Sequence, residues 1–399
     1  MELVLCYPVA SIGGAQKLLV TLVTALHESG MLRKVILFDF EGGYLSAELQ
    51  KSKVSLDIYD ISCINKFPFS ENAVLVTAFS EIKYLAQYEI TPSLKFVLWS
   101  IHPFGFSIFA RLGPLYRNLP FEYQWKVARY IEPSRFEALN RLIKLSCIGG
   151  AFWIMDESNY NFGNKIGFDL SHSKMVPIGI DFYKKNLALK SNFVRCKSSN
   201  FGWIGRLDKD KYLSLEHSLR LANDVASLLG KKVDFYIIGD GNAMNSVLKL
   251  KFPFLHIKCK GFLSGSTLNK FLLENTRIVF AMGTSALEAA ALEISTIIVD
   301  CLTHRVKNIY SNVHLMSQDS PYYLGDIIQL ERKSNINRED IYELFISDDI
   351  SDYATKCRLI AKTYFDMSTN LEHFDHETVS LLPSWEEIRG DIEYLFSSK

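Results

Sequence analysis

Two basic residues flank a short loop whose spacing suits the binding of a diphosphate. Arg206 and Lys211 lie in the segment that follows an expected buried strand ending at Gly205. A guanidinium can bind phosphate oxygens through paired hydrogen bonds, and an ammonium adds a point charge. Asp208 and Asp210 in the same loop imitate a D-x-D metal-binding pair, but the neighbouring cations favour solvated or ion-paired carboxylates. The loop therefore predicts an anion site and no metal site.

A second loop with the features of an anion site follows another expected strand. Gly283 makes the turn, and Thr284 and Ser285 are expected to cap the helix that begins there. Free backbone amides at the start of a helix favour an anion. Glu288 lies more than one turn inside this otherwise apolar helix, where a carboxylate needs a partner. Ribose hydroxyls would satisfy it, and so would a nearby basic side chain, so both interpretations remain open.

Two places in the N-terminal half also follow expected strands. Gly13 and Gly14 open the first expected helix, where glycines let the backbone approach a ligand closely. The spacing lacks the G-x-G-x-x-G pattern and the P-loop lysine, and a tight strand-to-helix turn explains it equally well. His102 stands at the carboxyl end of a strand, where an imidazole can donate to a substrate oxygen or carry a proton. A structural role for this histidine is the alternative.

These loops belong to a regular alternation of strands and helices. Short apolar, β-branched runs are expected as strands at 3–7, 35–40, 54–59, 73–78, 96–101 and 152–156, and again at 201–205, 235–239, 256–261, 278–282 and 296–300. Segments of helical periodicity, clearest at 16–27, 215–229 and 285–292, lie between them. Such repetition predicts α/β domains with parallel sheets covered by helices on both faces. We expect two doubly wound domains, over 1–182 and from 201 onward, joined by a polar linker over 183–200.

The composition narrows the class of protein. The 399 residues include 44 basic and 44 acidic side chains, so no global positive field attracts nucleic acid or a membrane. The seven cysteines are scattered without a C-x-x-C pair, which is typical of a reducing compartment. The N-terminus lacks the basic opening of a signal peptide, and no apolar run reaches the roughly 18 residues of a membrane span. These features favour a cytoplasmic enzyme without a nucleic-acid partner.

One segment departs from this neutral balance. Residues 111–144 contain seven basic and three acidic side chains, interleaved with tyrosines, phenylalanines and a tryptophan. Basic residues mixed with aromatic ones suit a helix at the surface of an anionic membrane. A pair of ordinary helices with one apolar face on the domain and solvated charges explains the segment equally well.

The motifs, taken in order, resemble those of the family-4 glycosyltransferases with the GT-B architecture, over nearly the whole chain. The matching segments are 13–16 (GGAQ), 156–158 (DES), 176–181 (VPIGID), Gly205-Arg-Leu-x-x-x-Lys211, 238–241 (IGDG), 261–262 (GF) and 384–386 (SWE). The resemblance implies two Rossmann-like doubly wound parallel-sheet domains facing a central cleft. The domain over 1–182 would bind the acceptor and the domain over 201–378 the nucleotide sugar. A helix within 379–399 would cross back to the N-terminal domain.

The resemblance also implies roles for individual residues. His102, Arg206 and Lys211 would act at the reacting groups, the last two by neutralising the departing diphosphate. The nucleotide sugar would be bound by Gly13, Gly14, Arg206, Lys211, Gly239, Gly241, Phe262, Gly283, Thr284, Ser285 and Glu288, the last on the ribose. No metal is expected to be required, because Arg206, Lys211 and the helix that begins at Thr284 would neutralise the diphosphate, and no cofactor is expected, since the nucleotide-diphosphate sugar is the donor substrate. Phe280 departs from the family, since it stands where the first glutamate of the E-x7-E signature is expected.

The implied activity is transfer of a hexose or N-acetylhexosamine from a nucleotide-diphosphate sugar, such as a UDP-sugar, with retention of configuration. The acceptor would be a glycan or a lipid-linked oligosaccharide, in the synthesis of a surface polysaccharide, lipopolysaccharide or glycolipid. Such an enzyme would be cytoplasmic and peripheral at the inner face of the membrane, with 111–144 as the contact. Two alternatives remain: a sugar-nucleotide 2-epimerase on the same fold, and a non-catalytic partner subunit, for which Phe280 is the motivation.

Overall fold

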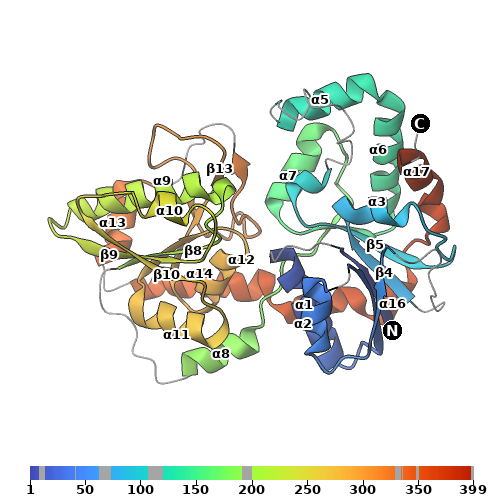
Figure 1. Cartoon of the computed structure of the whole chain (residues 1–399), viewed down its shortest axis with the longest axis horizontal. Coiled ribbons are helices and arrows are strands. Elements are labelled where there is room, and N and C mark those ends of the chain that lie inside the picture. The colour runs from blue at the N-terminus through green and yellow to red at the C-terminus, as the bar shows by residue number, and fades with distance from the viewer. Residues whose placement is uncertain are drawn as a thin grey trace. The chain divides into compact units, whose positions relative to one another are not determined.

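The computed structural model describes residues 1–8, 14–40, 42–62, 73–106, 119, 121–190, 200–328, 334, 336–346 and 350–396. Within these residues the chain forms two compact units (Figure 1). Unit 1 comprises Met1–Gly179 and Met367–Lys399, and unit 2 comprises Ile180–Asp366. Each unit contains one large sheet with helices on its faces, and each is described by itself.

Unit 1 is built on a seven-stranded sheet in the order β3-β2-β1-β4-β5-β6-β7. Its strands are β1 (Glu2–Cys6), β2 (Lys34–Asp39), β3 (Leu56–Asp60), β4 (Ala73–Ala78), β5 (Lys95–Ser100), β6 (Phe152–Ile154) and β7 (Lys174–Met175). All six pairings are parallel. The inner strands are buried along nearly their whole length, which explains their continuous apolar sequence. The predicted doubly wound parallel sheet is confirmed for this unit.

The helices of unit 1 connect these parallel strands. They are α1 (Gly14–Glu28), α2 (Tyr44–Gln50), α3 (Ile82–Leu85), α5 (Phe121–Ile131), α6 (Pro133–Ile148) and α7 (Glu157–Ile166), with short turns η1 (Phe79–Glu81) and η2 (Pro103–Phe106). On α1 the leucines and valines at helical spacing are buried, as the periodicity predicts. On α7 the carboxylate of Asp156 accepts from the N–H of Asn159 at 2.8 Å and so caps the helix.

The C-terminal segment returns to unit 1. It contains α15 (Met367–Leu371), η3 (Glu372–Phe374), α16 (His376–Ser380) and α17 (Glu386–Phe396). Helix α17 packs against α6 (Figure 1), and the Arg141 guanidinium of α6 lies 2.8 Å from the Asp391 carboxylate of α17. The buried Trp385 meets Phe96 of β5 edge to face. The expected return of the last helix to the N-terminal domain is therefore confirmed.

Unit 2 contains a six-stranded sheet in the order β10-β9-β8-β11-β12-β14. Its strands are β8 (Phe201–Ile204), β9 (Val233–Ile238), β10 (Leu255–Gly261), β11 (Ile278–Ala281), β12 (Ser295–Val299) and β14 (Val313–Leu315). The first five are parallel, as predicted, whereas β14 is antiparallel to β12. A small second sheet pairs β13 (Cys301–Leu302) with β15 (Ile327–Ile328).

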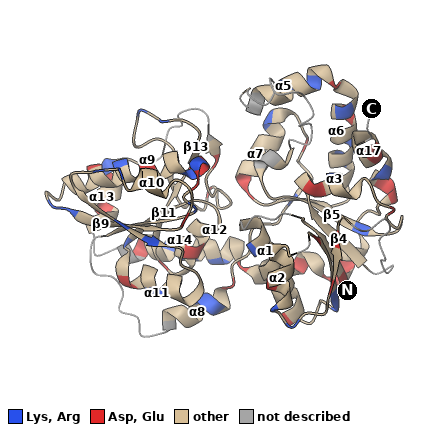
Figure 2. Ribbon diagram, in the orientation of Figure 1, with Lys and Arg blue, Asp and Glu red and all other residues tan. Residues whose placement is uncertain are grey.

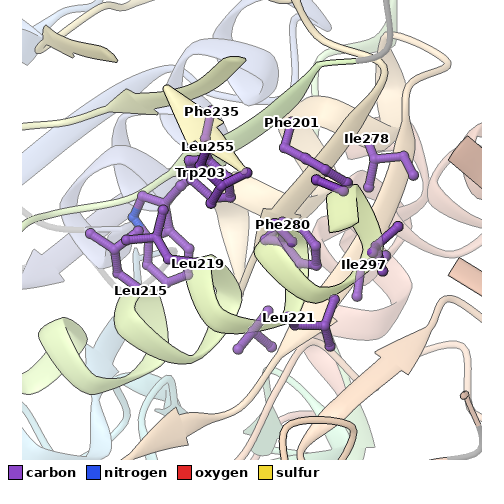
Figure 3. Close-up of a cluster of buried hydrophobic side chains, with 14 of the residues drawn as sticks. Phe201, Trp203, Leu215, Leu219, Leu221, Phe235, Leu255, Ile278, Phe280 and Ile297 are labelled. Carbon is purple, nitrogen blue, oxygen red and sulfur yellow. The ribbon is translucent and has the colours of Figure 1, made fainter. Parts of the chain in front are cut away.

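The helices of unit 2 enclose an apolar core. They are α8 (Phe182–Lys190), α9 (Lys209–Ser227), α10 (Met244–Val247), α11 (Gly265–Asn275), α12 (Thr284–Ala291), α13 (Arg338–Ile346) and α14 (Ile350–Phe365). Between α9 and the sheet lies a cluster of buried side chains, shown in Figure 3. Phe280 is fully buried in this cluster, with its ring 5.7 Å from that of Phe201 and 6.1 Å from that of Phe235.

The boundaries of the two units differ from the expected ones. The chain enters unit 2 at Ile180 and leaves it at Asp366, where the sequence suggested 201 and 378. The expected linker over 183–200 begins with α8, which belongs to unit 2. Its lysines obscured the helical period, because one of them, Lys185, is buried on an ion pair rather than exposed. Residues 191–199 of that linker lie outside the described residues.

No helix among the described residues combines the length and the apolar character needed to cross a bilayer. The five cysteines that the structure describes are all unpaired.

Candidate functional site

The strand order of unit 2 reverses beside β8. This strand lies between β9 and β11, so the chain leaves β8 toward one edge of the sheet and later continues from β11 toward the other. Loops that follow such a pair of strands leave in opposite directions, and open α/β sheets bind their ligands at this switch point. The two loops here are 205–208 and 282–283, which are the two anion-site candidates of the sequence. The structure therefore brings these candidates together at the carboxyl ends of two adjacent strands, β8 and β11, of one sheet.

The first loop holds its arginine in two ion pairs. The Arg206 guanidinium lies 2.6 Å from the Asp208 carboxylate and 3.5 Å from that of Asp210. The Arg206 side chain is 57% exposed. The expectation that the D-x-D carboxylates pair with cations is confirmed, and Asp208 makes no capping bond to α9 although it stands at the N-cap.

Lys211 connects the first loop with the second. It lies in the first turn of α9, and its ammonium donates to the sulfur of Met282 at 3.0 Å. Within the described residues no carboxylate lies at ion-pair distance from this ammonium. A thioether is a weak acceptor, so the positive charge of Lys211 is not neutralised by its protein partner. The charge is available to an anionic ligand at the switch point.

Gly239 and Gly241, which follow β9, pack directly against the backbone of the first loop. A Cβ on Gly239 would lie 1.9 Å from the carbonyl oxygen of Gly205, and one on Gly241 would lie 2.6 Å from the carbonyl carbon of Leu207. Both glycines have positive φ, +147° and +153°. A hydrogen bond joins the segment 239–241 to the first loop: the N–H of Leu207 donates to the carbonyl oxygen of Asp240 at 2.9 Å. Because both glycines contact the protein's own backbone, their role in this structure is to let the loop of Arg206 pack closely against the loop that follows β9.

The second loop starts α12 at a glycine. Gly283 is the N-cap, with φ +56°, and its N–H donates to the oxygen of Leu324 at 2.8 Å. No side chain caps the helix, so the expectation that Thr284 and Ser285 do so is wrong: they form its first turn. The backbone amides of a first turn lack acceptors within the helix. The amides of Thr284 and Ser285, together with the helix dipole, therefore favour an anion here.

Glu288 has a basic partner in the structure. The ammonium of Lys185 on α8 lies 2.7 Å from its carboxylate and also donates to the side-chain oxygen of Asn269 at 2.9 Å. Of the two interpretations of Glu288, the ion pair is the one present. Lys185 was missed because it lies in the segment expected as a linker; its spacing of three residues from the buried Phe182 is the signal that could have found it.

A buried carboxylate that the sequence analysis did not consider follows β12. Asp300 is fully buried and accepts hydrogen bonds from the N–H of Asp326 at 2.9 Å, from Nε2 of His314 at 3.3 Å and from the hydroxyl of Tyr323. Burial alone would raise the pKa of Asp300. The opposing effect is larger: the hydrogen bond and charge of His314 and the hydrogen bonds from Tyr323 and Asp326 stabilise the ionised carboxylate. The pKa is lowered from 3.8. Its position at the end of an expected strand is the signal that singled out the other candidates.

This buried carboxylate supports the turn at the start of α12. Asp300 holds the segment 323–326, and the carbonyl oxygen of Leu324 in that segment accepts from Gly283. Gly325 lies so close beneath that a Cβ on it would be 2.7 Å from the oxygen of Val299. The conformation of the second loop thus depends on a charge that the protein keeps out of solvent.

The remaining candidates lie elsewhere. Phe262 is 63% exposed, directly after the edge strand β10. His102 is exposed on unit 1 just after β5, and its carbonyl oxygen accepts from Gly105 at 2.7 Å. Gly14 is the exposed first residue of α1, and Gly13 lies outside the described residues. The structure thus brings together the candidates on 205–211 and 282–288, and describes His102 and Gly14 on unit 1.

The geometry of the switch point suits a diphosphate. It combines one ammonium without a carboxylate partner, one exposed guanidinium and the start of a helix, over the two adjacent strands β8 and β11. Over the described part of the chain, no group of three or more His, Cys, Asp and Glu side chains is arranged to hold a metal ion. The side chains of Arg206 and Lys211 and the amides at the start of α12 offer an anion positive charge and hydrogen-bond donors.

No family model and no curated protein sequence matches this chain. Solved structures do resemble it. Anabaena HepE in complex with UDP has a TM-score of 0.57 at 12% identity, over 96% of this chain and 100% of HepE. A mutant of S. aureus TarM in complex with fondaparinux, alpha-GlcNAc-glycerol and UDP has a TM-score of 0.56 at 10% identity, over 100% of both chains. A glycosyltransferase from Rickettsia africae has a TM-score of 0.52 at 12% identity, over 94% and 97%.

The two doubly wound sheets and these similarities identify the fold as GT-B.

Proposed function

We propose that this protein is a glycosyltransferase that uses a nucleoside-diphosphate sugar as donor. The observation that carries the proposal is the position of the Lys211 ammonium, 3.0 Å from Met282 and without a carboxylate partner among the described residues, at the switch point of unit 2. The GT-B fold supports it. The structurally similar proteins also support it, since HepE has been crystallised with UDP and with UDP-glucose, and the TarM mutant with UDP.

In the proposed reaction the diphosphate is the leaving group. Lys211 and the amides of Thr284 and Ser285 would bind its oxygens and stabilise the negative charge that develops as the glycosidic bond breaks. Arg206 would join them by exchanging Asp208 and Asp210 for phosphate oxygens, which its exposure permits. These groups make a metal unnecessary in the proposal.

The rest of the substrate would be bound by groups around this centre. Glu288 would accept hydrogen bonds from the ribose, and the exposed ring of Phe262 would contact the base. His102 of unit 1 would donate to an oxygen of the transferred sugar, a hexose or N-acetylhexosamine, with retention of configuration. Phe280 takes no part, because its ring is buried in the core (Figure 3). The alternative of a non-catalytic partner subunit rests on the absence of a carboxylate at this position, and nucleotide binding without turnover would favour it.

The acceptor is proposed to be a glycan or a lipid-linked oligosaccharide of a surface polysaccharide, and unit 1 is proposed to touch the membrane that carries it. On α5, Trp125 and Ala128 are buried, whereas Tyr123, Lys126 and Tyr130 are exposed. Tyr130 is 89% exposed. Lys and Arg on α5 and α6 are blue in Figure 2. Exposed aromatic rings beside basic residues are suited to the interface of an anionic membrane.

A donor screen tests the proposal. Melting curves of the purified chain are recorded with UDP-, GDP-, ADP- and TDP-sugars. In a separate assay, release of the nucleoside diphosphate is measured with and without a polyprenyl-linked glycan. Binding at 100 times the dissociation constant stabilises the folded state by about 2.7 kcal/mol, which a melting curve resolves. We expect stabilisation by one donor class and turnover that Arg206→Ala abolishes. The absence of both stabilisation and turnover with all four donor classes would overturn the proposal. Epimerisation of the sugar nucleotide without an acceptor would favour the epimerase.

A further inference from the structure

Three side chains from three helices of unit 2 meet at one buried ammonium. Lys185 of α8 donates to Glu288 of α12 at 2.7 Å and to Asn269 of α11 at 2.9 Å. Lys185 is only 8% exposed, and α8 packs on α11, as Figure 1 shows. A lysine is rarely buried to this extent, because removing an ammonium from water is costly unless it is paired. The position of this ammonium is therefore fixed by its two partners.

The carboxylate of Glu288 is not closed by this pair. Lys185 approaches one oxygen, Oε2, and no described residue donates to the other oxygen, Oε1. The Glu288 side chain remains 30% exposed while its partner is nearly covered. The pair thus has a buried, fixed end at the lysine and an accessible acceptor at the glutamate. Stability alone is a weak explanation for such a pair, because replacing a buried ion pair by apolar side chains is often neutral or stabilising.

The position of Glu288 along α12 suits a group joined to a phosphate. It lies four residues after Thr284, so it lies on the same face as the first turn and about 6 Å further along the helix axis. A nucleotide whose diphosphate meets the first-turn amides would present its ribose hydroxyls at a comparable separation. A carboxylate oxygen with open lone pairs is the acceptor that two adjacent hydroxyls require.

We propose that Lys185 is a positioning residue that directs Oε1 of Glu288 at the vicinal hydroxyls of the ribose, and thereby sets the preference for ribo- over 2′-deoxyribonucleotides. This inference rests on the proposed function, since it concerns the same nucleotide. Lys185 acts in two ways. It fixes the rotamer of Glu288 through Oε2, and its charge offsets that of the carboxylate, which would otherwise repel the diphosphate. Asn269 fixes the lysine in turn.

The test compares two ligands that differ by one hydroxyl. Dissociation constants of UDP and 2′-deoxy-UDP are measured by calorimetry for the wild-type chain, Lys185→Met and Asn269→Ala. A hydrogen bond to a charged group is worth at least about tenfold in affinity, so we expect the wild-type chain to prefer UDP by about that factor. In Lys185→Met the preference falls toward one, and in Asn269→Ala it falls part of the way. Because Asn269→Ala removes only one partner, it keeps the test open where Lys185→Met is too unstable.

A structural role for Lys185 predicts a different pattern. It would lower the melting temperature and weaken both ligands in parallel, with an unchanged ratio. Lys258→Met is the control for the loss of an ion pair away from the site, since Lys258 of the edge strand β10 makes a more exposed pair of similar length, 2.6 Å, with Asp234. An unchanged ratio in both site variants would overturn the inference and leave the proposed function intact. Failure of the wild-type chain to bind UDP, ADP, GDP or TDP would overturn the proposed function and this inference with it.

Discussion

The ammonium of Lys211 and the sulfur of Met282 lie 3.0 Å apart and join the two loops that leave the sheet of unit 2 on either side of its switch point. The contact brings a cation from α9 to the start of α12, where backbone amides already favour an anion. Neither loop alone has both features. The adjacency of β8 and β11 in the sheet, which are far apart in the sequence, creates the combination.

Removing the charge of Lys211 should impair ligand binding and, more strongly, turnover. We expect Lys211→Met to weaken UDP binding about 10- to 100-fold, the worth of a hydrogen bond between charged groups. The turnover number should fall about 100- to 1,000-fold, because the lost charge acts most strongly on the leaving diphosphate. Calorimetry and a diphosphate-release assay measure the two effects. The neighbouring, exposed Lys209→Met is the control and should retain wild-type values; an equal loss in both variants would point to a general field instead.

Adding a methyl group at Gly239 should destabilise unit 2 beyond the usual penalty of a positive φ. A Cβ there would lie 1.9 Å from the backbone oxygen of Gly205, so the loop must move. Gly230, with φ +62° and open space around it, is the reference site for the ordinary penalty of a positive φ. We expect Gly230→Ala to cost about 1 kcal/mol of unfolding free energy and Gly239→Ala more than about 3 kcal/mol. Urea unfolding followed by tryptophan fluorescence compares them, and equal costs would contradict the proposed close packing of the loop.

The buried charge of Asp300 should make stability depend on pH at the acid end. Its folded-state pKa lies below 3.8, so its contribution is present above the unfolded pKa and is lost as the pH falls through the folded one. We expect Asp300→Asn to cost about 2–3 kcal/mol at pH 7, and the difference from the wild-type chain to shrink below about pH 4. Unfolding at a series of pH values measures this difference. A gap that stays constant down to pH 2 would contradict an ionised Asp300.

The exposed side chains of α5 should contribute to membrane binding. Tyr130 and Ile131 are exposed, and each would bury apolar surface worth about 1–2 kcal/mol at an interface. We expect the wild-type chain to float with anionic vesicles at low salt, and a Tyr130→Asp/Ile131→Asp variant to bind at least about 30-fold less, the factor that a combined loss of about 2 kcal/mol represents. Leu381→Asp, at another exposed apolar residue of unit 1, should bind like the wild-type chain. A wild-type chain that stays with the soluble fraction would contradict the membrane contact.

The expected strands largely match those of the structure because most of them are apolar, β-branched runs buried on both faces, whereas the edge strands β3 and β10 are only partly buried. The start of α9 was harder to foresee, since its first turn is charged and its apolar period begins only near Leu215. The short antiparallel β14 has too few residues for a period. The positions of Lys185 and Asp300 carry a signal in the sequence, but their partners do not: Glu288 and His314 come from other elements, and only the fold brings each pair together.

Phe280 illustrates the limit of spacing alone. Counted back from Glu288, it stands where the E-x7-E signature that the sequence resembles has its first glutamate, yet it lies within β11 and faces the core, where a carboxylate would be surrounded by Phe201 and Phe235. Counting residues cannot register whether a strand has already ended. The burial of this side chain in the strand, rather than the missing charge, explains why an aromatic residue is present.

The return of residues 367–396 to unit 1 has a consequence for synthesis on the ribosome. Unit 2 is one continuous stretch and can fold once it has emerged, whereas unit 1 is interrupted by the whole of unit 2. Until the last helix is made, the partners of Trp385 and Asp391 on β5 and α6 lack their cover. The first domain to begin is therefore the last to be completed, which reverses the usual N-to-C order in which domains of a nascent chain reach their native state.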